Sequence, residues 1–339
     1  MCGAGGAGSV SESRAGQGSA ELTAEPAGLG QGSAEQAGKT AAEAENTELG
    51  QIRFWREDER KWEWPEPPEP LPSPVIDNHT HLDFAAGPHA PTPLEALEKA
   101  AAVGVTRIVQ VGTDLETSIW SAKFAANNPR VLAAIALHPN DAPEVAERGQ
   151  LDEQLAALDE LAAQPRVRAI GETGLDYFRT DETGRASQTA SFEAHIALAK
   201  KHGIALQIHD RDAHDDVVAT LLRMGAPERT VFHCFSGDAE LAKTCNDNGW
   251  YMSFSGTATF KNAPYLREAL EIADHDLVLV ETDAPFLTPE PVRGRPNAPY
   301  LLPYTVRRLA DHLGEDLAEF AARTAANTER VYGSWETGL

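Results

Sequence analysis

Two histidines, His79 and His81, stand two residues apart just after the apolar pair Val75 and Ile76. On an extended strand, residues i and i+2 point to the same side, so both imidazoles would face one point in space. A strand that ends in this way can offer two nitrogen ligands to a metal ion. Taken alone the pair is weak evidence, because neighbouring histidines are more often solvated or hydrogen-bonded than ligating.

Further candidate ligands follow short apolar runs later in the chain. Any one of them is explained equally well by a capped strand end or by a buried histidine with a hydrogen-bond partner. Five such residues at the same end of successive runs are hard to obtain by chance. Imidazoles and carboxylates without cysteine suit Zn²⁺, Mn²⁺ or Mg²⁺. The five residues are His138, Glu172, His209, His233 and Asp283.

The number of candidate ligands indicates more than one ion. Even with His138 set aside, four histidines and two carboxylates are too many for a single catalytic ion that keeps an open position. They suffice for two divalent ions that share a bridging carboxylate, an arrangement that stabilises both the attacking and the leaving oxygen in hydrolysis. The residue types therefore predict a hydrolase site with two divalent cations.

Eight apolar, strand-like runs alternate with helical segments after residue 75. Near-continuous apolar strands that alternate with helices indicate a parallel sheet covered on its outside, and eight such units favour an α/β fold of the (β/α)8 TIM-barrel type. A doubly wound open sheet is the alternative, disfavoured because no Gly-rich phosphate loop follows the first strand. The runs lie at 75–81, 108–111, 131–137, 167–170, 205–208, 230–232, 250–254 and 277–280.

Helix boundaries are marked by capping residues. Thr92, Pro93 and Glu95 supply an N-cap, a proline at the first helical position and the glutamate of a capping box, and Gly104 ends that segment. The spacing of apolar residues predicts further helices at 115–128 and 151–161, helices that end at residues 203, 225 and 249, one through 266 and 270, and two at 306–313 and 317–331.

Two segments precede the predicted barrel, which we assign to residues 75–339. Residues 1–50 are a low-complexity tail in which one hexapeptide occurs twice, and such a composition predicts disorder. Residues 51–74 form an arm rich in aromatic residues and proline. We expect its residues Trp55, Trp62 and Trp64 to pack on the outside of the barrel; stacking on nucleic-acid bases is the weaker alternative, because acidic residues crowd around them.

The overall charge limits the kind of partner. A net charge of −23 and a pI near 4.8 argue against binding nucleic acid through a broad basic face, so any phosphate substrate must be neutralised locally. The three cysteines show no paired spacing, which favours a reducing cytoplasm. The sequence contains neither an apolar run of membrane-spanning length nor a signal-peptide pattern, so we expect a cytoplasmic protein without a membrane partner. It makes no prediction about oligomeric state.

Five motifs, in this order along residues 75–333, resemble the TatD family of metal-dependent deoxyribonucleases. Residues 1–74 lie outside the resemblance. The motifs are His79-Thr80-His81-Leu82-Asp83, Gly171-Glu172-Thr173-Gly174-Leu175-Asp176-Tyr177, His209-Asp210-Arg211-Asp212-Ala213, His233-Cys234-Phe235-Ser236-Gly237 and Glu281-Thr282-Asp283-Ala284-Pro285.

The resemblance implies a barrel of the metal-dependent hydrolase superfamily with a two-metal site. By motif, His79, His81 and Asp283 would hold one ion. His209 and His233 would hold the other, and Glu172 would bridge the two. The implied activity is hydrolysis of phosphodiester bonds in DNA, as an exonuclease that works from 3′ single-stranded ends, with DNA ends as the partner.

Individual roles follow from position. Asp283, beside the ions, is the best candidate to accept a proton from water, although a purely ligating role explains it too. Arg211 lies two residues after His209 and could bind a phosphate, or equally form a surface salt bridge. His138 is expected to line the substrate pocket. Arg295 follows the eighth strand in a loop that resembles one beside the family site, and a simple loop before a helix is the alternative.

Two other functions fit part of the pattern. The same metals could cleave an ester or amide, such as the ester of a D-aminoacyl-tRNA, and the residues do not separate this reaction from phosphodiester cleavage. A non-catalytic binding scaffold is the third possibility. The complete set of six ligands argues against it, because a scaffold has no need of a reactive metal pair.

Overall fold

The computed structural model describes residues 49–54, 63–87 and 89–336. The predicted low-complexity tail therefore lies outside the described residues, apart from Leu49 and Gly50. Of the tryptophans in the arm, Trp64 is described, whereas Trp55 and Trp62 lie outside the described ranges. Cys234 and Cys245 are free thiols. No helix in the described ranges is long and apolar enough to span a membrane.

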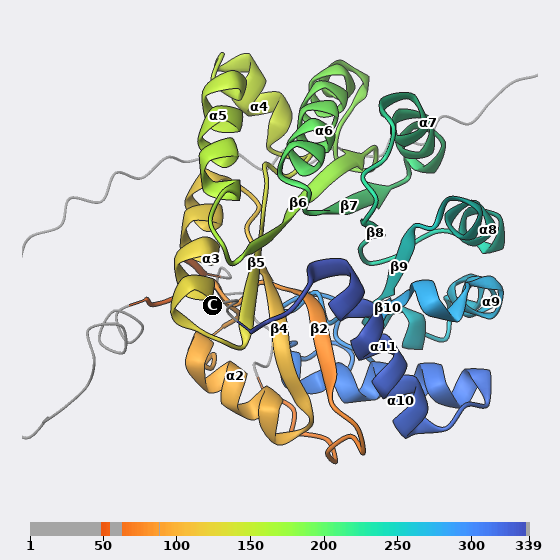
Figure 1. Ribbon diagram of the computed structural model, residues 1–339. Helices are drawn as coiled ribbons and strands as arrows, with labels where there is room; N and C mark the ends of the chain where they lie inside the picture. Colours follow the sequence, from red (N-terminus) through yellow and green to blue (C-terminus); the bar gives the residue numbers. More distant parts are fainter. Residues whose placement is uncertain (1–48, 55–62, 88, 337–339) are drawn as a thin grey trace, which may run out of the picture. The chain divides into compact units, whose positions relative to one another are not determined.

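Eight parallel strands form one sheet in the order β10-β9-β8-β7-β6-β5-β4-β2 (Figure 1). The two outer strands meet through a β-bridge between Thr80 and Ala284 and a hydrogen bond from Asp283 N to His79 O, so the ring nearly closes. The predicted (β/α)8 barrel is confirmed, and the open doubly wound sheet is excluded. The strands are β2 (Val75–Thr80), β4 (Val105–Val111), β5 (Val131–Ile135), β6 (Val167–Asp176), β7 (Ala205–Arg211), β8 (Thr230–Phe232), β9 (Tyr251–Phe254) and β10 (Val278–Val280).

The helices lie outside the strands (Figure 1). The capping box at Thr92 is present, and Gly203 and Gly249 end their helices in left-handed conformation, as the sequence predicts. The helices are α2 (Pro93–Ala102), α3 (Leu115–Asn127), α4 (Ala142–Glu147), α5 (Leu151–Ala162), α6 (Glu182–His202), α7 (His214–Met224), α8 (Ala239–Asn248), α9 (Pro264–Ile272), α10 (Leu302–Leu313) and α11 (Leu317–Tyr332), with 3₁₀ turns at Gly256–Thr259, His275–Leu277 and Pro299–Leu301.

Apolar side chains close the barrel near the N-terminal ends of its strands. Ile76, Ala205 and Val231 belong to a buried cluster that also contains Tyr332 and Trp335 from the end of the chain. A larger cluster fills the space between the strands and the helices. Because apolar side chains fill the interior at this end, we expect the functional site at the opposite end, where the strands have their C-termini.

A layer of buried polar contacts lies above this apolar floor. Asp77 accepts hydrogen bonds from the Thr282 backbone and hydroxyl, which ties β2 to the segment after β10. Gln207 donates to Tyr332 Oη, and that hydroxyl donates to Asn78 Oδ1 at 3.1 Å. Burial raises the pKa of Asp77 to about 8. These contacts set the positions of the residues that follow Asp77 and Thr282, where the candidate ligands lie.

The arm contacts the barrel at several points. Arg53–Phe54 (β1) pairs in parallel with Phe84–Ala85 (β3). Trp64 is partly buried against the apolar core, and Tyr300 Oη donates a hydrogen bond to Pro65 O at 2.8 Å. The described part of the arm therefore covers the barrel surface, and its tryptophan packs rather than projecting into solvent.

Candidate metal centre

The first half of the site is made of His79 and His81, at the end of β2, and Asp283, three residues after β10. His79 Nε2 lies 3.3 Å from His81 Nε2 and 3.6 Å from Asp283 Oδ1, and His81 Nε2 lies 3.4 Å from the same oxygen. All three residues are buried. Donor atoms about 2.1 Å from one tetrahedral ion stand about 3.4 Å apart, so this spacing fits a metal ion.

The histidines of the first half have defined orientations. His81 Nδ1 lies 2.9 Å from the Val111 carbonyl oxygen, which keeps its Nε2 free to face the site. His79 is wholly buried, and its Nδ1 has no hydrogen-bond partner among the described residues. Burial and the neighbouring His233 lower the pKa of His79. It is therefore a neutral imidazole, the form that ligates metals.

Glu172 presents one oxygen to each side of the site. Its Oε2 lies 3.5 Å from His79 Nε2 and 3.7 Å from His81 Nε2. Its Oε1 lies 2.7 Å from His209 Nδ1 and 2.8 Å from His233 Nε2. Burial alone would raise the pKa of Glu172, but the surrounding histidines outweigh burial and hold it well below its usual range. The carboxylate is therefore ionised and stands between two groups of imidazoles.

The second half of the site consists of the imidazoles around Glu172 Oε1, from His138, His209 and His233. His138 Nε2 is 3.3 Å from that oxygen. His209 Nε2 also lies 3.2 Å from Asp176 Oδ2. Burial would lower the pKa of His209, but its hydrogen bonds to Asp176 and Glu172 raise it. In this half the nitrogen–oxygen distances to His209 and His233 are those of hydrogen bonds rather than of ligands around one ion.

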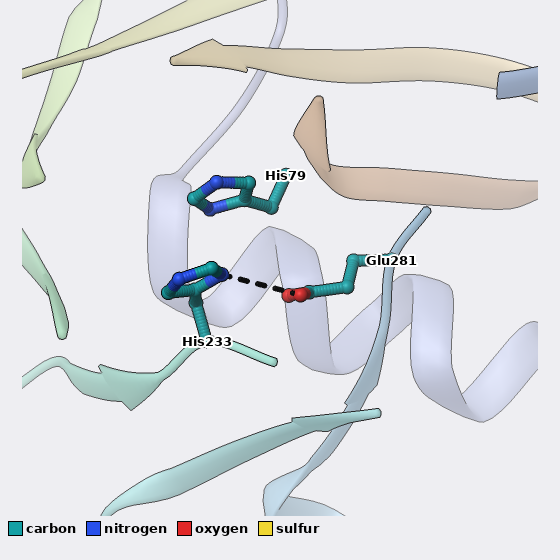
Figure 2. A group of neighbouring side chains, drawn as sticks. All are labelled: His79, His233 and Glu281. Atoms are coloured by element: carbon teal, nitrogen blue, oxygen red, sulfur yellow. Dashed lines mark hydrogen bonds and ion pairs between the residues drawn. The ribbon is translucent and has the colours of Figure 1, made fainter. Parts of the chain in front are cut away.

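The Glu281 carboxylate points toward the His233 ring and so orients it (Figure 2). His233 Nδ1 lies 3.3 Å from Glu281 Oε1, and the same oxygen accepts a hydrogen bond from Cys234 N. The His233 ring stacks on His79, with centroids 3.9 Å apart and planes 12° apart. A carboxylate on one ring nitrogen directs the other nitrogen to the metal side, and His79, His233 and Glu281 also lie close enough together to form a further candidate ligand group.

Two glycines explain how Glu172 reaches the centre of the site. A Cβ on Gly171 would lie 2.4 Å from Gln207 Cβ, and one on Gly174, where φ is +141°, would lie 2.1 Å from His209 O. Both glycines therefore let β6 approach β7 closely. The pairing shifts register between Ile170 and Thr173, and β6 continues to Asp176. Glu172 consequently lies inside the strand, not after its end as the apolar run predicted.

Sequence reasoning missed Asp176 and Glu281 as parts of the site. Asp176 accepts hydrogen bonds from Asn140 and from Arg179 N. Burial would raise the pKa of Asp176, but the hydrogen bond with His209 and the one from Arg179 N lower it to about 2. Both carboxylates stand inside motifs quoted above, and Glu281 directly follows an apolar run, so that signal was present in the sequence.

A cavity of about 360 Å³ opens above the candidate ligands. Arg211 lines it, with its guanidinium carbon 3.9 Å from the centre of the Phe178 ring, and no carboxylate of the described residues lies within salt-bridge distance of it. The predicted pocket residue His138 lines it too. Arg295 does not: it lies 3.8 Å from Glu63 in an exposed loop, which favours the simple loop over a substrate contact.

The sequence matches the family described as TatD related DNase over residues 76–333. An uncharacterized metal-dependent hydrolase TatD from Mycobacterium tuberculosis is 45% identical over 263 residues, which cover 76% of this chain and 98% of that protein. A protein named 3′-5′ ssDNA/RNA exonuclease TatD from Citrobacter rodentium is 34% identical over 245 residues, or 70% of this chain and 91% of that one.

Solved structures agree with the sequence matches. The crystal structure of a TatD homologue from Escherichia coli K12 superposes with a TM-score of 0.69 and 28% identity, covering 76% of this chain and 97% of that one. Matching sequence, matching fold and candidate metal-binding clusters at the C-terminal ends of the strands lead to one conclusion. The chain belongs to the TatD-related DNase family of metal-dependent hydrolases.

Proposed function

We propose that this protein is a two-metal phosphodiesterase that removes nucleotides from the 3′ end of single-stranded DNA. The observation that carries the proposal is the orientation of Glu172, whose two oxygens face two separate groups of imidazoles. A carboxylate that bridges two cations has this arrangement. The polarity and the preference for single strands rest on the relative from Citrobacter rodentium that is named as such an exonuclease.

The proposed ligands divide as the site does. His79, His81 and Asp283 would hold one ion, His209 and His233 would hold the other, and Glu172 would contact both. The donor set of imidazoles and carboxylates suits Zn²⁺, Mn²⁺ or Mg²⁺. Divalent ions bound there would supply positive charge that favours ionisation of water near neutral pH and stabilises negative charge on the phosphoryl oxygens.

Side chains of the protein itself accept the proton and bind the substrate. Asp283 lines the cavity and so meets water there, and its carboxylate accepts the proton of the attacking water. Arg211 donates hydrogen bonds to the phosphate that is being cleaved. His138 contacts the substrate from the loop after β5, where its Nε2 is close to Glu172.

The charge of the protein favours a single strand over a duplex. With a net charge of −23, the exterior repels an extended polyanion, whereas the cavity offers the guanidinium groups of Arg53, Arg179 and Arg211 beside the candidate metal ligands. A cavity of about 360 Å³ suits a terminal nucleotide and its neighbour rather than the side of a double helix. A threaded single-stranded end meets both conditions.

The test uses the full chain loaded separately with Mg²⁺, Mn²⁺ or Zn²⁺. A 5′-labelled single-stranded oligodeoxynucleotide is expected to shorten one nucleotide at a time, and a blunt duplex to react more slowly. Chelation is expected to abolish cleavage while the near-ultraviolet circular dichroism of the barrel persists, because the metals occupy only its rim.

A D-aminoacyl-tRNA serves as the comparison substrate. Its faster hydrolysis would assign the site to ester cleavage instead. Absence of DNA cleavage with all three metals, or cleavage that survives chelation, would contradict the proposal.

A further inference from the structure

Residues 49–54 are bound to the barrel although they lie ahead of the family match, which begins at residue 76. Ile52 N and Arg53 N both donate to Asp83 O at 3.0 Å. Trp120 Nε1 donates to Gly50 O and Gln51 Nε2 donates to Pro91 O, each at 2.9 Å. These contacts hold the segment beside the end of β2, next to the first half of the metal centre.

The segment brings the side chain of Arg53 into the wall of the cavity. Arg53 Nε donates to Asp83 Oδ2 at 2.5 Å, one terminal nitrogen donates to Asp83 Oδ1 at 3.1 Å, and the other donates to Thr113 Oγ1 at 3.0 Å. A guanidinium has five N–H donors, so two remain without a partner among the residues that the structure describes. The Arg53 side chain is 25% exposed.

The guanidinium is fixed before any ligand arrives. Asp83 is wholly buried and also accepts a hydrogen bond from Gln110 Nε2, while Leu82 N donates to Gln110 Oε1. The Arg53 guanidinium carbon lies 5.2 Å from the centre of the Phe84 ring. A preorganised donor loses little entropy on binding, so its free N–H groups bind an anion more tightly than a flexible side chain would.

Arg53 lies on the opposite side of the site from Arg211, another arginine of the cavity. Its partners, Asp83 and Thr113, follow β2 and β4, whereas Arg211 ends β7 and Arg179 follows β6. In the ring of eight strands, β7 is four strands away from β2. A chain that crosses the metal centre therefore meets arginine on both sides.

We propose that Arg53 forms a subsite for the phosphate next to the one being cleaved, so that the segment ahead of the family domain determines substrate length and affinity. The inference rests on the proposed function, since it assumes a phosphodiester chain in the cavity. Guanidinium donors match phosphate oxygens in geometry and charge, and the carboxylates elsewhere in the cavity leave few other contacts for an anion.

The experiment pairs a change in the protein with a change in the substrate. Oligodeoxynucleotides with one neutral methylphosphonate, placed at each linkage in turn from the 3′ end, are assayed with the parent and with Arg53→Ala. We expect a methylphosphonate at one linkage that is not itself cleaved to lower kcat/KM of the parent about 10- to 100-fold, mainly by raising KM. Arg53→Ala is expected to show the same decrease in kcat/KM on the all-phosphate strand. Neutralising that linkage should then cause no further decrease in the variant.

Controls separate a phosphate contact from a purely structural role. Arg223→Ala removes an exposed arginine that is also paired with a carboxylate, far from the cavity, and is expected to behave as the parent. Arg53→Lys keeps the charge and is expected to recover part of the lost affinity. If Arg53→Ala fails to fold, the same comparison is made with Arg53→Lys, whose sensitivity to the methylphosphonate then falls below that of the parent.

Two results overturn the inference in distinguishable ways. In the first, the parent cleaves DNA, but Arg53→Ala and each methylphosphonate lower kcat/KM by independent factors at every linkage. Arg53 then serves only to bind Asp83, and the proposed function stands without the subsite. If the parent neither binds nor cleaves the oligonucleotide, the proposed function fails and the subsite fails with it.

Discussion

The two halves of the metal centre differ in how closely their donor atoms approach one another. In the first half, His79, His81 and Asp283 stand 3.3 to 3.6 Å apart, a separation that matches donors around one ion. In the second half, His209 and His233 stand 2.7 and 2.8 Å from Glu172 Oε1, at hydrogen-bond distance. The first half is spaced for an ion, whereas an ion in the second must first separate hydrogen-bonded partners.

The difference is explained by what holds each group of side chains. The first half is fixed from below by Asp77 and Thr282 and from the side by the Val111 carbonyl, so its donors keep their distance. In the second half, His209 and His233 each have a carboxylate on the far ring nitrogen and lie at hydrogen-bond distance from Glu172. Preorganisation costs nothing at the moment of binding, so we expect the first ion to bind more tightly than the second.

The largest effect is expected from Glu172→Ala, because Glu172 belongs to both halves. In the proposed two-ion site, the substitution would remove a donor from each ion and leave two cations with less negative charge between them. Metal content, measured by elemental analysis after dialysis, is expected to fall for both ions, and DNA cleavage to be lost at any practical metal concentration. Two ions retained at the parent level would show that Glu172 does not bridge.

Asp283→Asn is expected to have a smaller effect on metal than on rate. The amide keeps the shape of the side chain and one oxygen donor, but it cannot accept a proton from water. Turnover should fall by about 10²- to 10⁴-fold, the usual effect of a lost general base. Metal content should exceed that of Glu172→Ala when both variants are measured at equal added metal. Full activity in Asp283→Asn would leave the proton acceptor unassigned.

A matched pair, His81→Ala and His209→Ala, tests the difference between the halves directly. Each variant loses one imidazole from one half, and each lost imidazole faces Glu172. We expect His209→Ala to lose the weakly bound ion and keep the other. His81→Ala is expected to lose the tightly bound ion and to weaken its neighbour as well. Equal losses, measured by calorimetric metal titration, would remove the asymmetry proposed here.

The smallest expected effect concerns His195, a buried histidine outside both halves. Leu137 N donates to its Nε2, and burial lowers the pKa of His195 from 6.5 to about 4. Between these two pH values, His195 therefore binds a proton in the unfolded chain but not in the folded protein. The free energy of unfolding should decrease as pH falls through the window from 6.5 to about 4, by roughly 3 kcal/mol for this residue.

The variant His195→Gln isolates that contribution. It retains a donor and an acceptor but does not titrate, so its stability should vary less with pH than that of the parent. Urea unfolding of the metal-free proteins at several pH values between 4 and 7 measures the difference. Parallel pH profiles for the two proteins would contradict the assignment to His195.

Much of the barrel could be predicted from the sequence because its strands are buried on both faces. Apolar runs such as Val131–Ile135 have few other uses, and cap residues such as Thr92 mark helix starts locally. The helix α4 was missed because it has only six residues and its N-cap residue Asp141 makes no side-chain cap hydrogen bond. Its formation depends on neighbouring elements rather than on its own residues.

The site was only partly predictable for a similar reason. Strand ends predicted the candidate ligands, because parallel strands bring their carboxyl ends together. The extension of β6 past Glu172 depends on contact of Gly171 and Gly174 with β7, which no local pattern encodes. The position of Arg53 depends on pairing with Asp83, thirty residues away, and a short arm of mixed composition carries no periodic signal for it.

The hydrogen bond from Tyr332 Oη to Asn78 Oδ1 joins residues 254 positions apart, so the strand that carries the first candidate ligands is synthesised long before this partner. At about 5 to 20 residues per second, a ribosome takes roughly 13 to 50 seconds to pass from one residue to the other. His79 and His81 are synthesised first, Asp283 follows about 200 residues later, and helix α11 comes after it. A growing chain therefore holds an incomplete set of the proposed metal ligands until Asp283 has been made, and the proposed nuclease becomes competent only after α11 has been synthesised.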